Sequence, residues 1–94
     1  MNIRFYTEPE TGEPHIYEHD VREQEVEDIL RHPGDDFPGR GNSRVALGQT
    51  EAGRYLQVVY VPDPDQHGVF VVTAYTLRGK ALAAYRRRKR LKGR

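Results

Sequence analysis

The sequence predicts a single α+β domain in which an antiparallel β-sheet carries helices mainly on one face. Residues 20–31 place apolar side chains at helical spacing, and residues 78–92 are rich in Ala, Leu, Arg and Lys. Ninety-four residues suffice for one hydrophobic core, so we expect one domain over residues 1–94. Strand-length runs of alternating or apolar residues occur at 3–6, 43–49, 55–61 and 69–75.

The N-terminal third should contain a short strand followed by an acidic helix. Residues 3–6 alternate between apolar and polar and lead into a turn-rich segment, which predicts an edge strand or half of a hairpin. We expect the helix to begin at Asp20, whose carboxylate can cap it, with Glu23 completing a reciprocal capping pair. It should end near Arg31, because Pro33 disfavours helical backbone at the residue before it.

The middle of the chain should form a long loop and then a three-stranded meander. Residues 32–42 contain two Pro and three Gly, which predicts a loop. The three following runs are separated by short polar turns, so neighbouring strands should pair antiparallel. Residues 55–61 and 69–75 are apolar on both faces, which predicts central strands covered on both sides.

A basic helix should close the chain, from Arg78 to about Lys92. Arg88 falls within the apolar arc of this helix, so we expect it either at the edge of the core or aimed at a specific partner. Residues 86–94 form a basic tail. The apolar arc itself is predicted to contain Leu77, Ala81, Ala84, Tyr85 and Leu91.

Charge is divided unevenly along the chain. All fourteen acidic residues lie in residues 1–75 together with six Arg, whereas residues 76–94 hold nine Lys or Arg and no acid. This asymmetry predicts an anionic partner: nucleic acid, an acidic protein, or the acidic body of the chain itself. The absence of cysteine excludes disulfides and thiol chemistry. No segment reads as a signal peptide or a membrane span, so we expect a cytoplasmic protein that does not enter a membrane.

Several short motifs occur in an order that is typical of a toxin family. They are His19-Asp20-Val21 before the acidic helix, Leu47-Gly48-Gln49-Thr50, Gly53-Arg54-Tyr55-Leu56, Val72-Thr73-Ala74 and the terminal arginines. In this order the chain resembles the RelE/ParE superfamily of type II toxins. It is more closely similar to BrnT-like proteins and to a related small family of unassigned function.

The resemblance implies a RelE-like fold and a metal-independent endoribonuclease that is neutralised by a partner antitoxin. BrnT-like chains tend to have Lys directly before the His that leads the helix, where this chain has Glu18, and Ala-Arg at the end of the last strand, where it has Ala74-Tyr75. The alternative is a non-catalytic binding module that uses the basic helix to bind RNA or an acidic protein.

Cutting RNA without a metal requires a base for the 2′-OH, a cation for the phosphorane and an acid for the leaving oxygen. In the expected sheet, Arg54 and Tyr75 reach one edge, beside the start of the basic helix with Lys80. We therefore expect Arg54, Tyr75 and Lys80 to be catalytic, with His19 as the base if its segment folds toward them. Each also has a structural reading, as a strand start, a core-closing aromatic or a first-turn residue. Residues expected to bind RNA or another anion are Arg44, Arg78, Arg86, Arg87, Lys89 and Arg90.

We expect no metal ion and no cofactor. His15 and His19 have a spacing that could hold a metal on a helix, but Pro14 and the cap at Asp20 place this stretch before the expected helix. The basic helix could instead pair with the chain's own acids at Glu25, Glu27 and Asp28.

Overall fold

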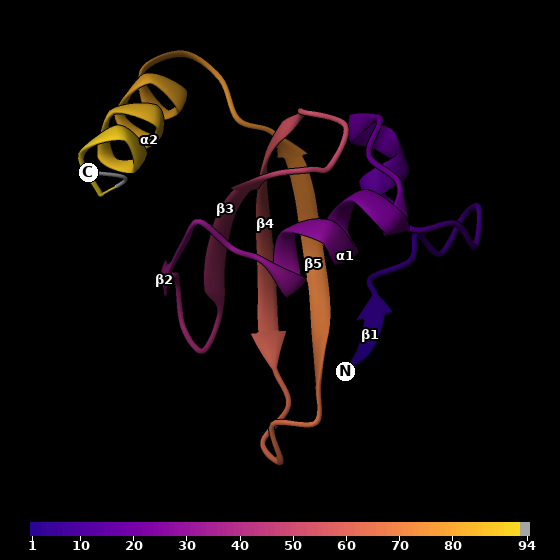
Figure 1. The fold of residues 1–94 in the computed structure, drawn as a ribbon. Coiled ribbons are helices and arrows are strands. Elements are labelled where there is room, and N and C mark those ends of the chain that lie inside the picture. Colours follow the sequence, from indigo (N-terminus) through magenta and orange to yellow (C-terminus); the bar gives the residue numbers. More distant parts are fainter. Residues whose placement is uncertain (93–94) are drawn as a thin grey trace.

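The computed structural model describes residues 1–92 as a mixed five-stranded sheet with helices on both sides (Figure 1). The sheet order is β1-β5-β4-β3-β2. Residues 93–94 of the expected basic tail lie outside the described residues, and residues 86–92 belong to the last helix. The elements are β1 (Asn2–Phe5), the 3-10 helix η1 (His15–His19), α1 (Glu23–Arg31), β2 (Asp35–Pro38), β3 (Arg44–Gln49), β4 (Tyr55–Pro62), β5 (Gly68–Thr76) and α2 (Gly79–Lys92).

The α+β class and the β3–β4–β5 meander are confirmed, but the sheet is not wholly antiparallel. Its edge strand β1 pairs in parallel with β5, with Ile3 opposite Val69. Residues 3–6 were expected to form an edge strand or half of a hairpin, and β1 is an edge strand. After it the chain turns back through an isolated bridge between Thr7 and Pro14. The chain then turns into η1 and α1, which cross to the other half of the sheet.

The prediction of a loop over residues 32–42 was wrong, because this segment contains β2. Its strand pairs antiparallel with β3, with Asp36 opposite Ala46. A tight turn closes the hairpin, in which the Gly39 N–H donates to the Ser43 carbonyl at 2.9 Å. A strand with two acids and a proline lacks the usual apolar pattern, but such residues suit an exposed sheet edge.

The predicted start of the acidic helix was also wrong. Asp20 adopts a left-handed conformation with φ of 59° and ends η1 instead of capping α1. The residue before α1 is Arg22, and its backbone N–H donates to Glu25 Oε1 at 2.9 Å. The capping pattern is therefore shifted by two residues, because η1 occupies the stretch that precedes it.

Two hydrophobic clusters occupy opposite faces of the sheet. We call the face covered by α1 and η1 the front face. There Val26 and Ile29 of α1 pack over Ala46, Leu56 and neighbouring residues, all of which are buried. Leu47 has the opposite orientation on β3, so its side chain lies on the back face, where it packs with residues of the α2 segment.

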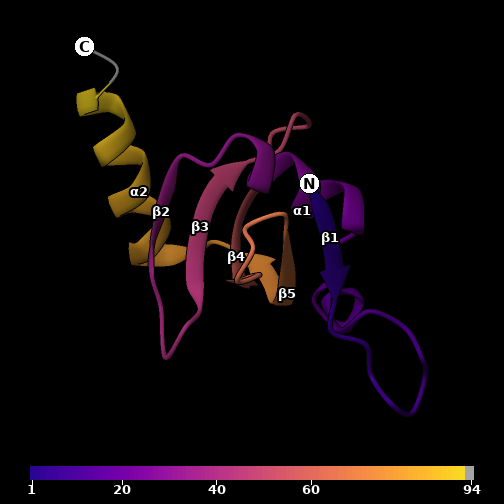
Figure 2. The same cartoon turned by 90° about the horizontal axis from the view of Figure 1, so that it is seen from below.

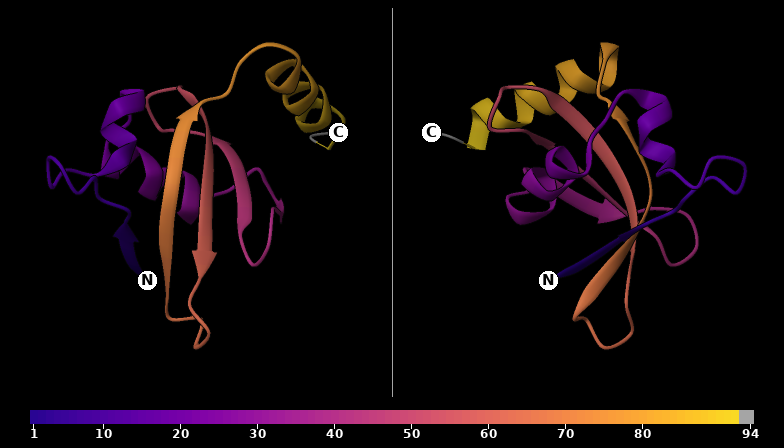
Figure 3. Two further views of the ribbon diagram at one scale, coloured as in Figure 1. Left: turned by 180° about the vertical axis from the view of Figure 1, so that it is seen from behind. Right: turned by 90° about the vertical axis from the view of Figure 1, so that its right-hand side faces the viewer.

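The back face carries α2 at the β2–β3 side and leaves the remaining strands uncovered. Figure 3 (left) shows β4 and β5 from this side without a helix in front of them. Val72 is 37% and Tyr75 36% exposed. The sequence-based predictions of central strands covered on both sides, and of helices mainly on one face, were therefore wrong.

The last helix has a narrower buried side than the sequence predicted. Leu77 and Tyr85 are 3% and 4% exposed, but Leu91 is 66% exposed and Ala81 is also exposed. Viewed from below in Figure 2, α2 stands beside β2, and the turn after β1 projects from the other edge. None of the helices within residues 1–92 has the length and apolar composition required to cross a bilayer.

Candidate functional site

His19 and Tyr75 come together on the back face although they lie far apart in the sequence. Their ring centroids are 5.8 Å apart, with the ring planes inclined by 57°. The η1 helix ends directly after His19, where Asp20 adopts a left-handed conformation. The path of η1 therefore sets the position of the His19 side chain. We call the hollow that contains this pair the histidine–tyrosine hollow, and its lining residues are Glu18, His19, Tyr75, Thr76 and Arg78.

The hydroxyl of Tyr75 is oriented by a neighbouring strand. Gln57 lies opposite Tyr75 in the β4–β5 pairing, and its side-chain amide Nε2 donates to Tyr75 Oη at 2.7 Å. The phenol oxygen accepts this bond, so the Tyr75 O–H itself can still donate to another group. This arrangement leaves the tyrosine able to act as an acid.

Arg54 is held on the front face, away from Tyr75. Its Nη1 donates to the Asp20 carbonyl at 2.6 Å and to Glu25 Oε1 at 3.0 Å, and its Nη2 donates to Thr76 Oγ1 at 2.9 Å. Thr76 follows Tyr75 in β5, and successive side chains of a strand point to opposite faces. The expected neighbours Arg54 and Tyr75 therefore share an edge of the sheet but not a face.

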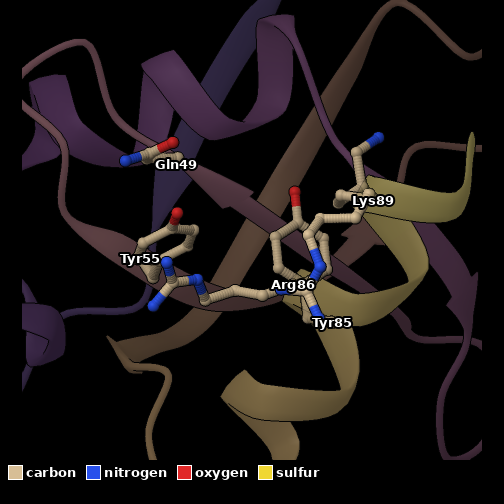
Figure 4. A pocket seen from close by; sticks show the side chains of 6 residues that line it. Gln49, Tyr55, Tyr85, Arg86 and Lys89 are labelled. Carbon is tan, nitrogen blue, oxygen red and sulfur yellow. The ribbon is translucent and has the colours of Figure 1, made fainter. Parts of the chain in front are cut away.

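A second hollow lies on the back face between α2 and the sheet. We call it the α2 hollow, and Figure 4 shows its lining residues from close by. The Arg86 guanidinium lies over the ring of Tyr55, 5.7 Å from its centroid, and the Tyr55 and Tyr85 rings are 6.1 Å apart, edge to face. These rings and cations offer both stacking and charge to an anionic aromatic ligand. The lining residues are Gln49, Tyr55, Tyr85, Arg86, Lys89 and Arg90.

Contacts between α2 and the segment before β2 hold this hollow in place. Arg88 makes an ion pair with Asp35 at 2.8 Å, and Lys89 Nζ donates to the Gly34 carbonyl at 3.3 Å. The Tyr85 hydroxyl packs so closely on Gly34 that a Cβ at this position would overlap it. Burial, followed by the charge of Asp35, raises the pKa of Tyr85 above its usual value. Arg88 thus has the specific partner that its place in the apolar arc suggested.

The two hollows are neighbours. Tyr55 lines the α2 hollow, and Gln57, which holds Tyr75, is two residues further along β4 on the same face. Side chains two residues apart on one strand are about 6.6–6.8 Å apart. The two hollows therefore adjoin on the back face.

The remaining predicted residues are dispersed. Arg44 lies on the front face, where its Nε donates to Asp36 Oδ1 at 2.9 Å. Lys80 and Arg87 are exposed on α2, apart from the lining of either hollow. Of the three acids expected to pair with the basic helix, Glu25 binds Arg54, Glu27 lies near Arg31, and Asp28 accepts a bond from the Glu51 N–H. The helix makes its ion pair with Asp35.

One protein family matches most of the chain. Residues 15–76 match the family described as Domain of unknown function (DUF4258). The chain belongs to the DUF4258 family. No curated protein and no solved structure matched it.

The matched DUF4258 segment begins at η1 and ends with β5. It includes His19 and Tyr75, whereas β1 and α2 lie outside it. The histidine–tyrosine hollow is therefore formed mostly by the DUF4258 core, with Arg78 added from the segment that follows. The cations of the α2 hollow are an addition to that core.

Sequence reasoning missed two features of this DUF4258 chain. One is Gln57, which reads in the sequence only as a polar residue in an apolar strand. The other is a cluster of Glu8, His15 and Glu18, whose potential ligand atoms all lie within 4.8 Å of one another. The signal for the second was the three-residue spacing of His15 and Glu18, which a 3-10 helix places on one side.

Proposed function

We propose that this chain is a RelE- and BrnT-like toxin-type protein, a metal-independent endoribonuclease that is neutralised by a partner antitoxin. The observation that carries the proposal is the pairing of His19 and Tyr75 in one hollow beside Arg78. The antiparallel meander followed by a basic helix supports the RelE-like comparison.

In the proposed reaction His19 takes the proton from a ribose 2′-OH, and the 2′-oxygen attacks the adjacent phosphorus. Arg78 neutralises the charge that builds up on the phosphorane oxygens. Tyr75 gives its proton to the departing 5′-oxygen, which leaves a 2′,3′-cyclic phosphate and a 5′-hydroxyl. Arg54 has a positional role, because its bonds to Asp20 and Thr76 fix the residues that follow His19 and Tyr75.

The α2 hollow binds the RNA next to the scissile bond. Its three cations, Arg86, Lys89 and Arg90, face a hollow without an acidic lining residue. Phosphate contacts of this kind give affinity that does not depend on base sequence and that falls as salt rises. Tyr55 supplies a ring on which a base can stack.

An antitoxin would act by covering the back face. The half-exposed residues Val72 and Tyr75 line one hollow on this uncovered part of the sheet. A partner that buries them would close the histidine–tyrosine hollow at the same time. Cellular expression of the chain without its partner should therefore arrest growth.

Cleavage of a labelled single-stranded RNA in excess EDTA tests the enzymatic proposal. We expect cleavage by the intact chain, and a loss of about 100-fold or more in both His19→Ala and Tyr75→Phe, the scale of a general acid or base. The control His67→Ala alters an exposed histidine outside the histidine–tyrosine hollow and should cleave normally. A folded chain that leaves every RNA intact would contradict the proposal.

The second candidate function is RNA binding without cleavage. The α2 hollow favours it, because its cations and Tyr55 need no catalytic group to hold RNA. In that case Arg86→Ala with Arg90→Ala should weaken RNA binding and flatten its salt dependence, and no RNA should be cut under any condition. An unchanged affinity in this double variant would exclude the α2 hollow as the binding surface.

A further inference from the structure

We propose that Glu8, His15 and Glu18 form a binding site for one divalent transition-metal ion, with Zn²⁺ as the probe. Their potential ligand atoms lie within 4.8 Å of one another. The set provides one imidazole nitrogen and two carboxylate oxygens. The site adjoins the histidine–tyrosine hollow, because Glu18 also lines that hollow. The proposal does not depend on the proposed function.

The backbone brings the three side chains together before any ion binds. The Glu8 N–H donates to the Glu13 carbonyl at 2.9 Å, and the His15 N–H donates to the Tyr6 carbonyl at 2.8 Å, which closes the turn after β1. Glu18 follows His15 by three residues in η1, and a 3-10 helix has about three residues per turn. The ligands are therefore held by two short connections rather than by a long flexible loop.

The distances need only a small adjustment to admit an ion. His15 Nδ1 is 2.5 Å from Glu8 Oε1 and 3.8 Å from Glu18 Oε2. Ligands on a tetrahedral zinc ion, with bonds of about 2.0–2.2 Å, lie about 3.3 Å from one another. Relative to His15 Nδ1, each carboxylate oxygen would have to shift by less than about 1 Å, which a glutamate side chain can do by rotation.

Charge and ligand type both indicate the class of ion. As ligands, the two carboxylates together carry a charge of −2, which a divalent cation balances. A nitrogen ligand favours Zn²⁺ or Fe²⁺ over Mg²⁺ and Ca²⁺, which prefer oxygen ligands. Three protein ligands leave positions for water, and Glu18 is 59% exposed on its side chain.

The position of the site gives the ion a defined structural effect. His15 also lines an apolar hollow with Tyr6, His19 and Tyr75, and the His15 and His19 rings are 5.2 Å apart. An ion held by Glu8 and Glu18 would connect the turn after β1 to η1. The ion would thereby hold η1, which carries His19, against that turn.

Calorimetric titration of the metal-free chain with ZnCl₂ tests the proposal. We expect one equivalent to bind, and a loss of affinity of tenfold or more in His15→Ala and in Glu18→Gln. Glu18→Gln keeps the shape of an exposed side chain, so it should fold normally. The control is His67→Ala, because His67 also has an acidic neighbour, Asp65 at 3.7 Å, but on an exposed loop.

A spectroscopic readout tests the location. Substoichiometric Mn²⁺ should broaden the imidazole NMR signals of His15 and His19 before those of His32 and His67. Absence of zinc binding by the intact chain would overturn the proposal. So would His15→Ala and Glu18→Gln variants that bind zinc as tightly as the intact chain does. None of these outcomes depends on ribonuclease activity, because the titration can be repeated with the His19→Ala variant.

Discussion

The imidazole of His19 and the phenol of Tyr75 lie 5.8 Å apart, one from η1 and the other from the end of β5. Gln57 holds the tyrosine from the adjacent strand, and Arg78 follows in the same hollow. An imidazole, a phenol and a guanidinium therefore line one small region at the edge of the uncovered sheet.

Arg54→Ala should lower the free energy of unfolding by about 2–3 kcal/mol, because it leaves the half-buried Glu25 carboxylate without its cation and removes two further hydrogen bonds. The matched control is Arg31→Ala, which removes only an exposed helix pair with Glu27 and should cost at most about 0.5 kcal/mol. Urea denaturation measures both. Equal losses in the two variants would show that Arg54 does not stabilise the junction of η1, α1 and β5.

Gly34→Ala should destabilise the packing of α2 by about 1–3 kcal/mol, because its Cβ would overlap the Tyr85 hydroxyl. Tyr85→Phe removes the nearest overlapping atom, so the double variant should recover part of the loss. A double-mutant cycle in urea gives the coupling energy between the two sites. Strict additivity would contradict the contact.

The contribution of Tyr60 to stability should be lost in alkali. Burial, with a hydrogen bond to Asp36, raises the pKa of Tyr60 from 10.0 to about 12. Its contribution is therefore complete below pH 10 and is lost as the pH rises toward 12, by on the order of 2 kcal/mol. In Tyr60→Phe the unfolding free energy should fall less over this window than in the intact chain, whereas Tyr6→Phe should follow the intact chain. A Tyr60→Phe variant with the same alkaline slope as the intact chain would refute this assignment.

Arg88→Ala and Arg87→Ala remove the same charge from neighbouring positions of α2. Arg88 makes an ion pair with Asp35, whose side chain is 13% exposed, whereas Arg87 is exposed on α2. Arg88→Ala, and not Arg87→Ala, should therefore speed hydrogen exchange of the α2 amides. We expect the loss of this ion pair to lower the free energy of local opening of α2 by about 1 kcal/mol. Identical exchange in the two variants would mean that Asp35 does not anchor the helix.

Much of the fold was predictable because it depends on local patterns. The runs in β3, β4 and β5 have the alternation and length of strands, and their polar turns fix the antiparallel order. The edge strand β2 was not predictable, because Asp35–Pro38 has no apolar alternation and is defined by its pairing with β3. The start of α1 was misplaced because the left-handed conformation of Asp20 depends on η1.

The candidate site was only partly predictable for a similar reason. Tyr75 could be assigned to the sheet edge near Arg54 from strand order alone, and that edge is correct. The face could not be assigned, because a one-residue change in where β5 meets the edge moves a side chain to the other side. The pairing with His19 depends on the path of η1, which no local pattern determines.

The most direct test of the central claim uses an RNA whose scissile 5′-oxygen is replaced by sulfur, because a thiolate leaves without a proton. If Tyr75 is the acid and His19 the base, Tyr75→Phe should cut this substrate at nearly the rate of the intact chain, and His19→Ala should remain impaired by about 100-fold or more. Equal impairment of both variants on the sulfur substrate would contradict the assignment of Tyr75 as the acid.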